Sequence, residues 1–345
     1  MQNLPYSRSI RFLLILGLSL GCIAQAFSQN EKIDTSYVFS QTDKLLTRFY
    51  FSKKYTDFRL KNPDSGNSLR YMPNSGLNVG LGFTYQKFTL NVAVPLGLLN
   101  PDRQKNFPSY LDLQTHYYPT HWIIDLFGQF YNGYTISDFS GKDVSYLRED
   151  MKVRKLGVLA SYVFNGHRIS IDAAMHNSSI QKRSAFSPIV GFEAYRVVVQ
   201  GDSVIFPVEE NFPVSFRRAD FIHFGPNAGL VGTLVFGKGF FLTGALIGNL
   251  GAGYSKWDEN SATSTWKAVP SYSARGFAGY NNRKFSINVN YVYKHLNLAS
   301  EFDLNQSVNT GNYRLNFVYK FEVSEKFARK FAKFNPVNII GLGLK

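Results

Sequence analysis

Apolar and polar side chains alternate along most of the chain after its first 45 residues. Between Lys284 and Lys294 every second residue is apolar or aromatic, and Ser286, Asn288 and Asn290 lie between them. Because successive side chains of a β-strand point to opposite faces, this pattern predicts a strand with one apolar face and one polar face. We expect lipid against the apolar face, which consists of Phe285, Ile287, Val289, Tyr291 and Tyr293.

The same period of two predicts twelve strands. Other clear examples surround Leu81, Val92 and Phe317. The expected strands are 46–60, 76–86, 88–97, 110–118, 121–134, 152–164, 167–177, 220–236, 239–255, 268–280, 283–297 and 310–322.

Three features favour a membrane barrel over a soluble β-sandwich. Many strands have about 10 to 16 residues, whereas soluble strands average about 5 to 6 and a bilayer needs about 9 to 11. Aromatic residues recur near strand ends, where an aromatic girdle would lie. Short turns such as Asn165-Gly166 alternate with long polar connections such as 135–151, as they do in outer-membrane barrels. The predicted fold is all-β, a transmembrane antiparallel up-and-down β-barrel over residues 46–322.

One stretch leaves the strand count open. Ile189–Val199 and Ser203–Phe206 have the pattern of a hairpin around Gly201-Asp202. The hairpin either rises from an outer loop, which leaves twelve strands in the wall, or joins the wall, which makes about fourteen. Both counts are even, as in bacterial single-chain barrels, and we favour twelve.

The first 28 residues are predicted to be a cleaved signal peptide. Arg8 and Arg11 precede the apolar segment Phe12–Ile23, which is too short to cross a bilayer as a helix, and a small-residue cleavage site ends at Ser28. Residues 29–45 are then a periplasmic segment. If cleavage also removes Cys22, which is the only cysteine, the mature chain has no disulfide and no thiolate metal site.

A basic extension, residues 323–345, follows the predicted barrel. Phe327, Phe331 and Phe334 recur with helical spacing among lysines and arginines, and Ser324 can cap the helix. The pattern predicts a short amphipathic helix on a membrane surface or under the barrel, with a solvated tail as the alternative.

Composition and charge limit the partners. Charged residues make up 18% of the chain, below the roughly 25% of soluble domains, and aromatic residues make up 16%. The net charge is +14, but the basic residues are scattered and form no recognised nucleic-acid motif. We expect outer-membrane lipid and the barrel-assembly machinery as partners, no nucleic acid, and a monomer.

Five polar side chains are predicted to form a cluster in the lumen: Asp112, His116, Asp125, Asp172 and Arg314. Asp112 and Asp125 lie on strands that a short turn joins, so the two carboxylates could act as an acid–base pair. We favour a structural ion network with Arg314, Lys284 or Lys320, because narrow barrels fill their interior with polar side chains.

Other signals of catalysis or cofactor binding are weak. The six histidines are dispersed, and the chain has neither a Gly-x-Ser-x-Gly elbow nor a His-x-x-x-His or paired-cysteine spacing. Closely spaced glycines such as Gly248 and Gly251 fall within strands, and no nucleotide-binding fingerprint follows them. We therefore expect no cofactor, no metal ion and no enzymatic activity.

Several segments resemble the bacterial outer-membrane proteins grouped as the domain of unknown function 4421 family. Together they cover most of the chain from about residue 40 to 322. The resemblance implies an outer-membrane β-barrel of undefined activity and carries over no catalytic residues. The resembling segments are Tyr71–Asn74, Leu77–Gly82, Tyr110–His116, Ile124–Gly133, Gln181–Ala185 and Gly311–Phe317.

The expected function is therefore that of a protein located in the outer membrane, either a narrow channel for small solutes or a scaffold that presents its outer loops. Two alternatives remain. A barrel hydrolase would lose its activity when Asp125 or His116 is replaced. A soluble periplasmic β-sheet binding protein would dissolve without detergent.

Overall fold

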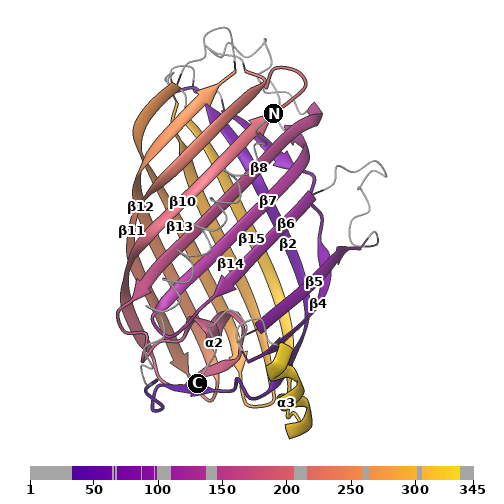
Figure 1. Ribbon diagram of the computed structural model, residues 1–345, viewed down its shortest axis with the longest axis vertical. Helices are drawn as coiled ribbons and strands as arrows, with labels where there is room; N and C mark the ends of the chain where they lie inside the picture. The colour runs from indigo at the N-terminus through magenta and orange to yellow at the C-terminus, as the bar shows by residue number, and fades with distance from the viewer. Residues whose placement is uncertain are drawn as a thin grey trace, which may run out of the picture.

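The wall of the protein is a closed antiparallel sheet (Figure 1). The computed structural model describes residues 33–63, 66, 68–86, 88–96, 98, 110–136, 146–205, 216–258, 264–300 and 305–334. The predicted signal peptide and residues 29–32 lie outside this part. The elements are β1 (Val38–Ser40), β2 (Leu45–Lys61), β3 (Ser68–Pro73), β4 (Asn78–Tyr85), β5 (Phe88–Pro95), β6 (Tyr110–Tyr117), β7 (Trp122–Ile136), β8 (Tyr146–Val163), α2 (Ile171–Met175), β9 (Ser179–Gln181), β10 (Ala185–Gln200), β11 (Arg218–Phe236), β12 (Phe240–Trp257), β13 (Ser264–Asn281), β14 (Phe285–Leu298), β15 (Asn305–Phe321) and α3 (Glu325–Phe334).

Ten of the described strands close into a ring. Their order is β2, β3, β7, β8, β10, β11, β12, β13, β14 and β15, and β15 pairs again with β2. Closure supplies ladder partners on both sides of each strand. A hydrocarbon environment requires this, because it offers no hydrogen bonds to backbone groups.

The outer face of the ring is apolar and the inner face is largely polar. On β12, Leu242, Leu246 and Leu250 are exposed, whereas Thr243 and Asn249 on the opposite face are buried. This arrangement is the reverse of a soluble protein, in which the apolar face of a sheet packs into a core.

Aromatic side chains lie at both ends of the apolar outer face. Toward the upper part of this face, Tyr313 stacks on Tyr55 and Tyr291, and at the lower end of β15 Phe321 packs on Tyr319. Strand β15 advances ten residues from Gly311, opposite Tyr55, to Phe321. For a tilted strand this is about 25 Å along the barrel axis, which matches the apolar band of outer-membrane barrels.

The wall forks at residues 74–77. Above this point β3 pairs with β2 and β7, and below it β4 pairs with β2 and β5. The lower wall therefore runs β2–β4–β5 on one side and β6–β7 on the other. No ladder joins β5 to β6 within the described residues. We call this unpaired boundary between β5 and β6 the seam.

The expected twelve or fourteen wall strands are thus replaced by a closed ring of ten, with β4, β5 and β6 added in the lower wall. The pattern of residues 76–86 correctly indicates β4. Strand β3 has only six residues and ends at Pro73, so its period of two is too short to stand out from the surrounding loop.

The strand predicted at residues 167–177 is wrong. Residues 164–184, which we call the plug, fold into the lower mouth of the barrel and contain α2 and β9. The Ser170 hydroxyl accepts a hydrogen bond of 3.1 Å from the Ala173 amide and caps α2. The apolar positions Ile169 and Ile171 do become buried. They pack from a turn and a helix, not from a strand. Three alternating residues are too few to distinguish a strand from a helical turn, so the pattern misled the prediction.

For the predicted hairpin around Gly201-Asp202, the structure has the wall placement that the sequence left open instead of the favoured outer loop, and only its first arm is a strand in the described part. Strand β10 is a full wall strand that pairs with β8 and β11, and Phe206 lies outside the described residues. The inward positions of β10 include Ile189, Glu193 and Val197. Their mixture of apolar and charged side chains hides the polar face that identifies the other strands.

Helix α3 lies below the hairpin of β4 and β5. The Ser324 hydroxyl accepts a hydrogen bond of 3.3 Å from the Phe327 amide, and the rings of Phe327 and Phe331 contact Tyr85. The side chain of Phe334 lies outside the described part. Within that part, no helix is long and apolar enough to cross a membrane.

The seam predicts uneven backbone protection. Amide groups of β5 and β6 that face the seam lack a ladder partner, so they should exchange hydrogen at least about ten-fold faster than the amides of β12. Hydrogen–deuterium exchange with peptide resolution on the detergent-folded protein measures this difference. Equal protection of β5, β6 and β12 would show that the seam is paired.

Candidate functional site

A charge pair crosses the middle of the lumen. The Arg275 guanidinium on β13 donates to Asp125 on β7, and these strands are five places apart in the ring of ten. The other Asp125 oxygen lies 2.6 Å from His116 Nδ1 and accepts a hydrogen bond of 3.1 Å from the Tyr118 hydroxyl. The carboxylate is fully buried, so both of its oxygens are occupied inside the barrel.

A second charge pair crosses the lumen nearby. Lys294 on β14 donates to Glu193 on β10, and the Ser271 hydroxyl donates to the same oxygen at 2.9 Å. Lys155 on β8 reaches Thr310 on β15 at 2.8 Å. Opposite walls are therefore bonded directly to each other through side chains, which is how narrow barrels fill their interior.

The predicted lumen cluster divides into separate groups. Asp112 lies opposite Gln129, accepts 2.6 and 3.0 Å hydrogen bonds from Tyr131 and Gln129, and forms an ion pair of 3.3 Å with Lys54. Asp112 thus does not pair with Asp125. Arg314 lies with its guanidinium 4.6 Å from the centre of the Tyr50 ring.

Asp172 does not project from a wall strand, as predicted, but lies on α2 in the plug. Its carboxylate is 2.8 Å from His176 Nδ1 and accepts a hydrogen bond from Ser178. The expected partners Lys284 and Lys320 lie elsewhere: Lys320 donates to Gln41 and to Asn281, and the Lys284 amide is bonded within the turn after β13.

The plug is bonded to the wall on several sides. Arg48 on β2 donates to the His176 carbonyl at 2.8 Å, and Asn281 on β13 donates to the Ser179 carbonyl at 2.9 Å. Below the plug, the Ser36 hydroxyl and amide donate to Asp34, and these bonds hold the pKa of the Asp34 carboxyl below its usual value.

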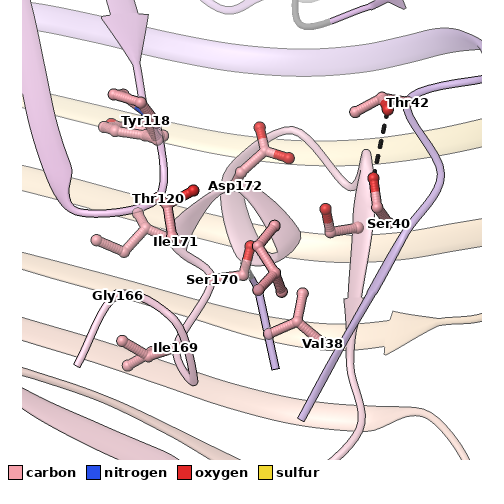
Figure 2. A pocket seen from close by; sticks show the side chains of 13 residues that line it. Val38, Ser40, Thr42, Tyr118, Thr120, Gly166, Ile169, Ser170, Ile171 and Asp172 are labelled. Carbon is pink, nitrogen blue, oxygen red and sulfur yellow. Dashed lines mark hydrogen bonds between the residues drawn. The ribbon is translucent and has the colours of Figure 1, made fainter. Parts of the chain in front are cut away.

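A small pocket lies between the plug, β1 and the β6–β7 turn (Figure 2). Its volume is about 50 Å³, which is room for a few water molecules. Asp172 and Ser170 line it from the plug, and Ser40 lines it from β1. Gly166 borders it where a Cβ atom would lie 2.0 Å from the Thr120 carbonyl oxygen, so this turn requires glycine. The pocket is too small for an organic substrate.

The upper end of the lumen is filled by apolar side chains, which we call the upper layer. Phe58, Tyr71, Tyr134, Phe216 and Trp257 are among its buried members. Each of them lies within six residues of the upper end of a strand. Leu298, the last residue of β14, belongs to the same layer. The lumen therefore has an apolar top, a charged middle and a plug at the bottom.

His116 and Asp125 are the pair among these groups that resembles an acid–base arrangement. His116 is oriented by Asp125, as a catalytic base would be. In the described part of the chain, however, no serine or threonine hydroxyl is bonded to His116, and no group of three metal-ligating side chains occurs.

The five side chains predicted to face lipid lie together on the outer face of β14, where Phe285, Ile287 and Val289 are exposed.

Sequence reasoning missed Arg275, Glu193, Lys294 and Lys155. Each occupies an inward position of a period-two strand, and that was the only available signal. Which inward charge meets which depends on the order of strands around the ring and on their stagger, neither of which a single strand pattern contains.

Breaking the cross-lumen pair should destabilise the barrel. Replacing Arg275 with Met leaves Asp125 buried without its cation, which typically costs about 3–5 kcal/mol. Urea unfolding in lipid vesicles, followed by tryptophan fluorescence, should show this loss for Arg275→Met. The double variant Asp125→Leu/Arg275→Met should recover part of it, and Arg168→Met at the exposed lower rim should change little. Equal stability of Arg275→Met and the parent would contradict the assignment.

Comparisons place this chain among known proteins. A search of curated proteins found no match. Similar solved structures are the P. putida toluene transporter TodX (8% identity, 82% of this chain and 91% of that chain, TM-score 0.25), OmpT of Vibrio cholerae (9%, 80% and 97%, 0.27) and Ail, the attachment invasion locus protein of Yersinia pestis (14%, 80% and 99%, 0.21). A family model described as "Domain of unknown function (DUF4421)" matches residues 32–321. As the sequence resemblance implied, the protein belongs to the DUF4421 family.

Proposed function

We propose that the protein is an outer-membrane scaffold with a closed lumen, which presents its upper connections outside the cell. The observation that carries this proposal is the direct bonding of opposite walls by Arg275–Asp125 and Lys294–Glu193. These pairs lie between the upper layer and the plug, so a solute moving along the axis meets three successive barriers. The finding supports a scaffold over the narrow channel that the sequence also allowed.

The connections support the orientation. At the lower end, β11 and β12, and β13 and β14, are joined by the short turns 237–239 and 282–284. The upper ends of neighbouring strands are further apart in sequence, with nine residues between β7 and β8 and six between β12 and β13. Outer-membrane barrels have short periplasmic turns and long outer loops. The plug and α3 then lie at the periplasmic end, which agrees with a chain that enters from the periplasm after removal of a signal peptide.

The proposal assigns no catalytic role to His116 and Asp125. Both Asp125 oxygens already serve as acceptors, and Arg275 balances the charge of the carboxylate. The His116–Asp125 contact is accounted for as one bond in the network that joins β6, β7 and β13.

Conductance in planar bilayers tests the closed lumen. The parent protein should show no stepwise conductance across a wide voltage range. A variant that replaces residues 168–183 with a short glycine–serine linker, carries Phe58→Ala and Trp257→Ala, and replaces both charge pairs with serine (Asp125→Ser/Arg275→Ser and Glu193→Ser/Lys294→Ser) removes all three barriers and should show steps, which also demonstrates insertion. Steps from the parent protein would refute the scaffold and favour the channel.

The seam favours a second candidate function, the lateral exchange of an anionic amphiphile between membrane and lumen. Arg48 donates to Asn91 on β5 at 3.0 Å, and Lys54 forms an ion pair with Asp112 on β6. Arg48, Lys54 and Arg314 thus place three positive charges next to the seam, and Asp112 is the one carboxylate among them. The Nε atoms of Arg48 and Arg314 are buried without a hydrogen-bond partner in the described part. Unpaired buried donors favour an anionic ligand.

Binding of a spin-labelled long-chain carboxylic acid tests this candidate. Arg314→Gln should weaken binding about ten-fold, because a charge-assisted bond contributes about 1.5–3 kcal/mol. The exposed Arg168→Gln serves as the matched control, and a long-chain alcohol serves as the uncharged ligand. Equal affinity for acid and alcohol, or no effect of Arg314→Gln, would exclude the cations as a headgroup site.

A further inference from the structure

A charged cluster lies on the outer face of the barrel at the upper end of β2 and β3. It consists of Asp57, Arg59, Arg70, Asn309 and His295, and we call it the arginine cluster. In the alternation of β2, Asp57 and Arg59 share the outward face with Phe49 and Tyr55, whereas Phe58 and Leu60 point into the upper layer. The cluster therefore faces the surroundings of the barrel and does not belong to the lumen network.

Two like charges are held next to each other in this cluster. Arg59 and Arg70 are direct cross-strand partners, an arrangement that normally destabilises a sheet. Both bond the same oxygen of Asp57, Arg59 at 3.2 Å through Nη2 and Arg70 at 2.7 Å through Nε. Asp57 is fully buried, whereas the Arg59 and Arg70 side chains are 41% and 45% exposed. One carboxylate thus positions two accessible guanidinium groups.

The neighbouring polar groups do not neutralise the excess charge. Asn309 donates to the other Asp57 oxygen at 2.7 Å, and its own carbonyl oxygen lies 2.5 Å from His295 Nδ1. His295 Nε2 lies 2.9 Å from the Asn297 carbonyl oxygen. The cluster supplies no second anion, so it has at least one net positive charge.

The arginines retain donors for a ligand. The Nη atoms of Arg70 have no acceptor within the described part of the chain. A guanidinium group presents parallel N–H donors that match two oxygens of a phosphate. Two adjacent guanidinium groups can therefore bind one phosphate monoester with more than two charge-assisted hydrogen bonds.

The position of the cluster selects the kind of phosphate. Tyr55 and Tyr293 lie directly below it, two residues from Asp57 and His295, and Tyr272 lies beside it, with its ring centre 5.0 Å from that of His295. Aromatic girdles mark the level of lipid headgroups. A phosphate at this level belongs to a lipid whose acyl chains pass down the apolar wall below.

We propose that the arginine cluster binds the phosphate group of a phosphorylated lipid in the outer leaflet. The choice of leaflet rests on the proposed orientation, whereas the lipid phosphate site itself requires only membrane insertion. Bound phosphate relieves the repulsion between Arg59 and Arg70 and fixes the rim of the barrel at β3, next to the fork of the wall. The site thereby attaches the shortest strand of the ring to the membrane.

Titration of the full-length protein in detergent micelles tests the proposal, with short-chain phosphatidic acid as the probe. Arg70→Gln should weaken binding at least about ten-fold, and Arg59→Gln/Arg70→Gln should weaken it further. Arg168→Gln, which alters an exposed Arg–Asp contact at the opposite end, should bind like the parent. Diacylglycerol with the same acyl chains lacks the phosphate, so its affinity should be the same for the parent and for every variant.

The remaining outcomes are distinguishable. Heat-modifiable migration of every variant on gels confirms that the barrel is folded. If folded Arg59→Gln/Arg70→Gln binds phosphatidic acid as the parent does, the site is refuted. If inorganic phosphate binds as tightly as the lipid, the ligand is a free anion and the lipid assignment is wrong. If the parent stays soluble without detergent, the membrane proposal fails instead, independently of the arginines.

Discussion

Charged side chains that reach across the lumen hold the middle of this barrel together. A charge inside a closed sheet is removed from bulk water, so each carboxylate must find a cation within bonding distance or lose its charge. Asp125 and Glu193 find theirs on strands at the far side of the ring, Arg275 and Lys294. The partners fix the distance between opposite walls, and the proposed closed lumen rests on this bonding. The apolar upper layer and the plug extend the same closed interior to both ends.

Closure of the backbone is the second constraint, and it is incomplete at one place. Ten strands satisfy one another around the upper ring, but the fork at residues 74–77 separates β4 and β5 from β6. Unpaired strand edges are costly in hydrocarbon. Strand β5 ends at Pro95. Proline is tolerated at a strand edge because it has no backbone N–H group that would lack a hydrogen-bond partner. The cations behind the seam and the arginine cluster above the fork place unbalanced positive charge near this irregular part of the wall.

The sequence predicts the wall well where period-two alternation continues for ten residues or more. Strand β14 has a clean separation from Phe285 to Tyr291, with Ser286, Asn288 and Asn290 inward and apolar or aromatic residues outward, so its extent and inward residues follow from the pattern. The pattern indicated a strand at β10 but favoured its placement in an outer loop, because its inward face mixes Ile189 with Glu193. The prediction failed at the plug, where Ile169 and Ile171 suit a strand and a helical turn equally. It identified Asp125 and His116 as lumen residues, but the neighbour it expected for Asp125 across the short hairpin was Asp112 and not His116. It could not identify Arg275, because strand order and stagger bring that residue to Asp125 from the opposite wall.

Accessibility of the lumen to water at its middle level tests the account most directly. Ser273 points inward on β13 next to Arg275 and is buried, and Ser264 is exposed at the upper end of the same strand. In a chain with Cys22→Ser, each serine can be replaced by cysteine and exposed to a small charged thiol reagent in lipid vesicles. The account predicts rapid labelling of Ser264→Cys and no labelling of Ser273→Cys over the same period. Rapid labelling of both would show an aqueous lumen and contradict the closed barrel.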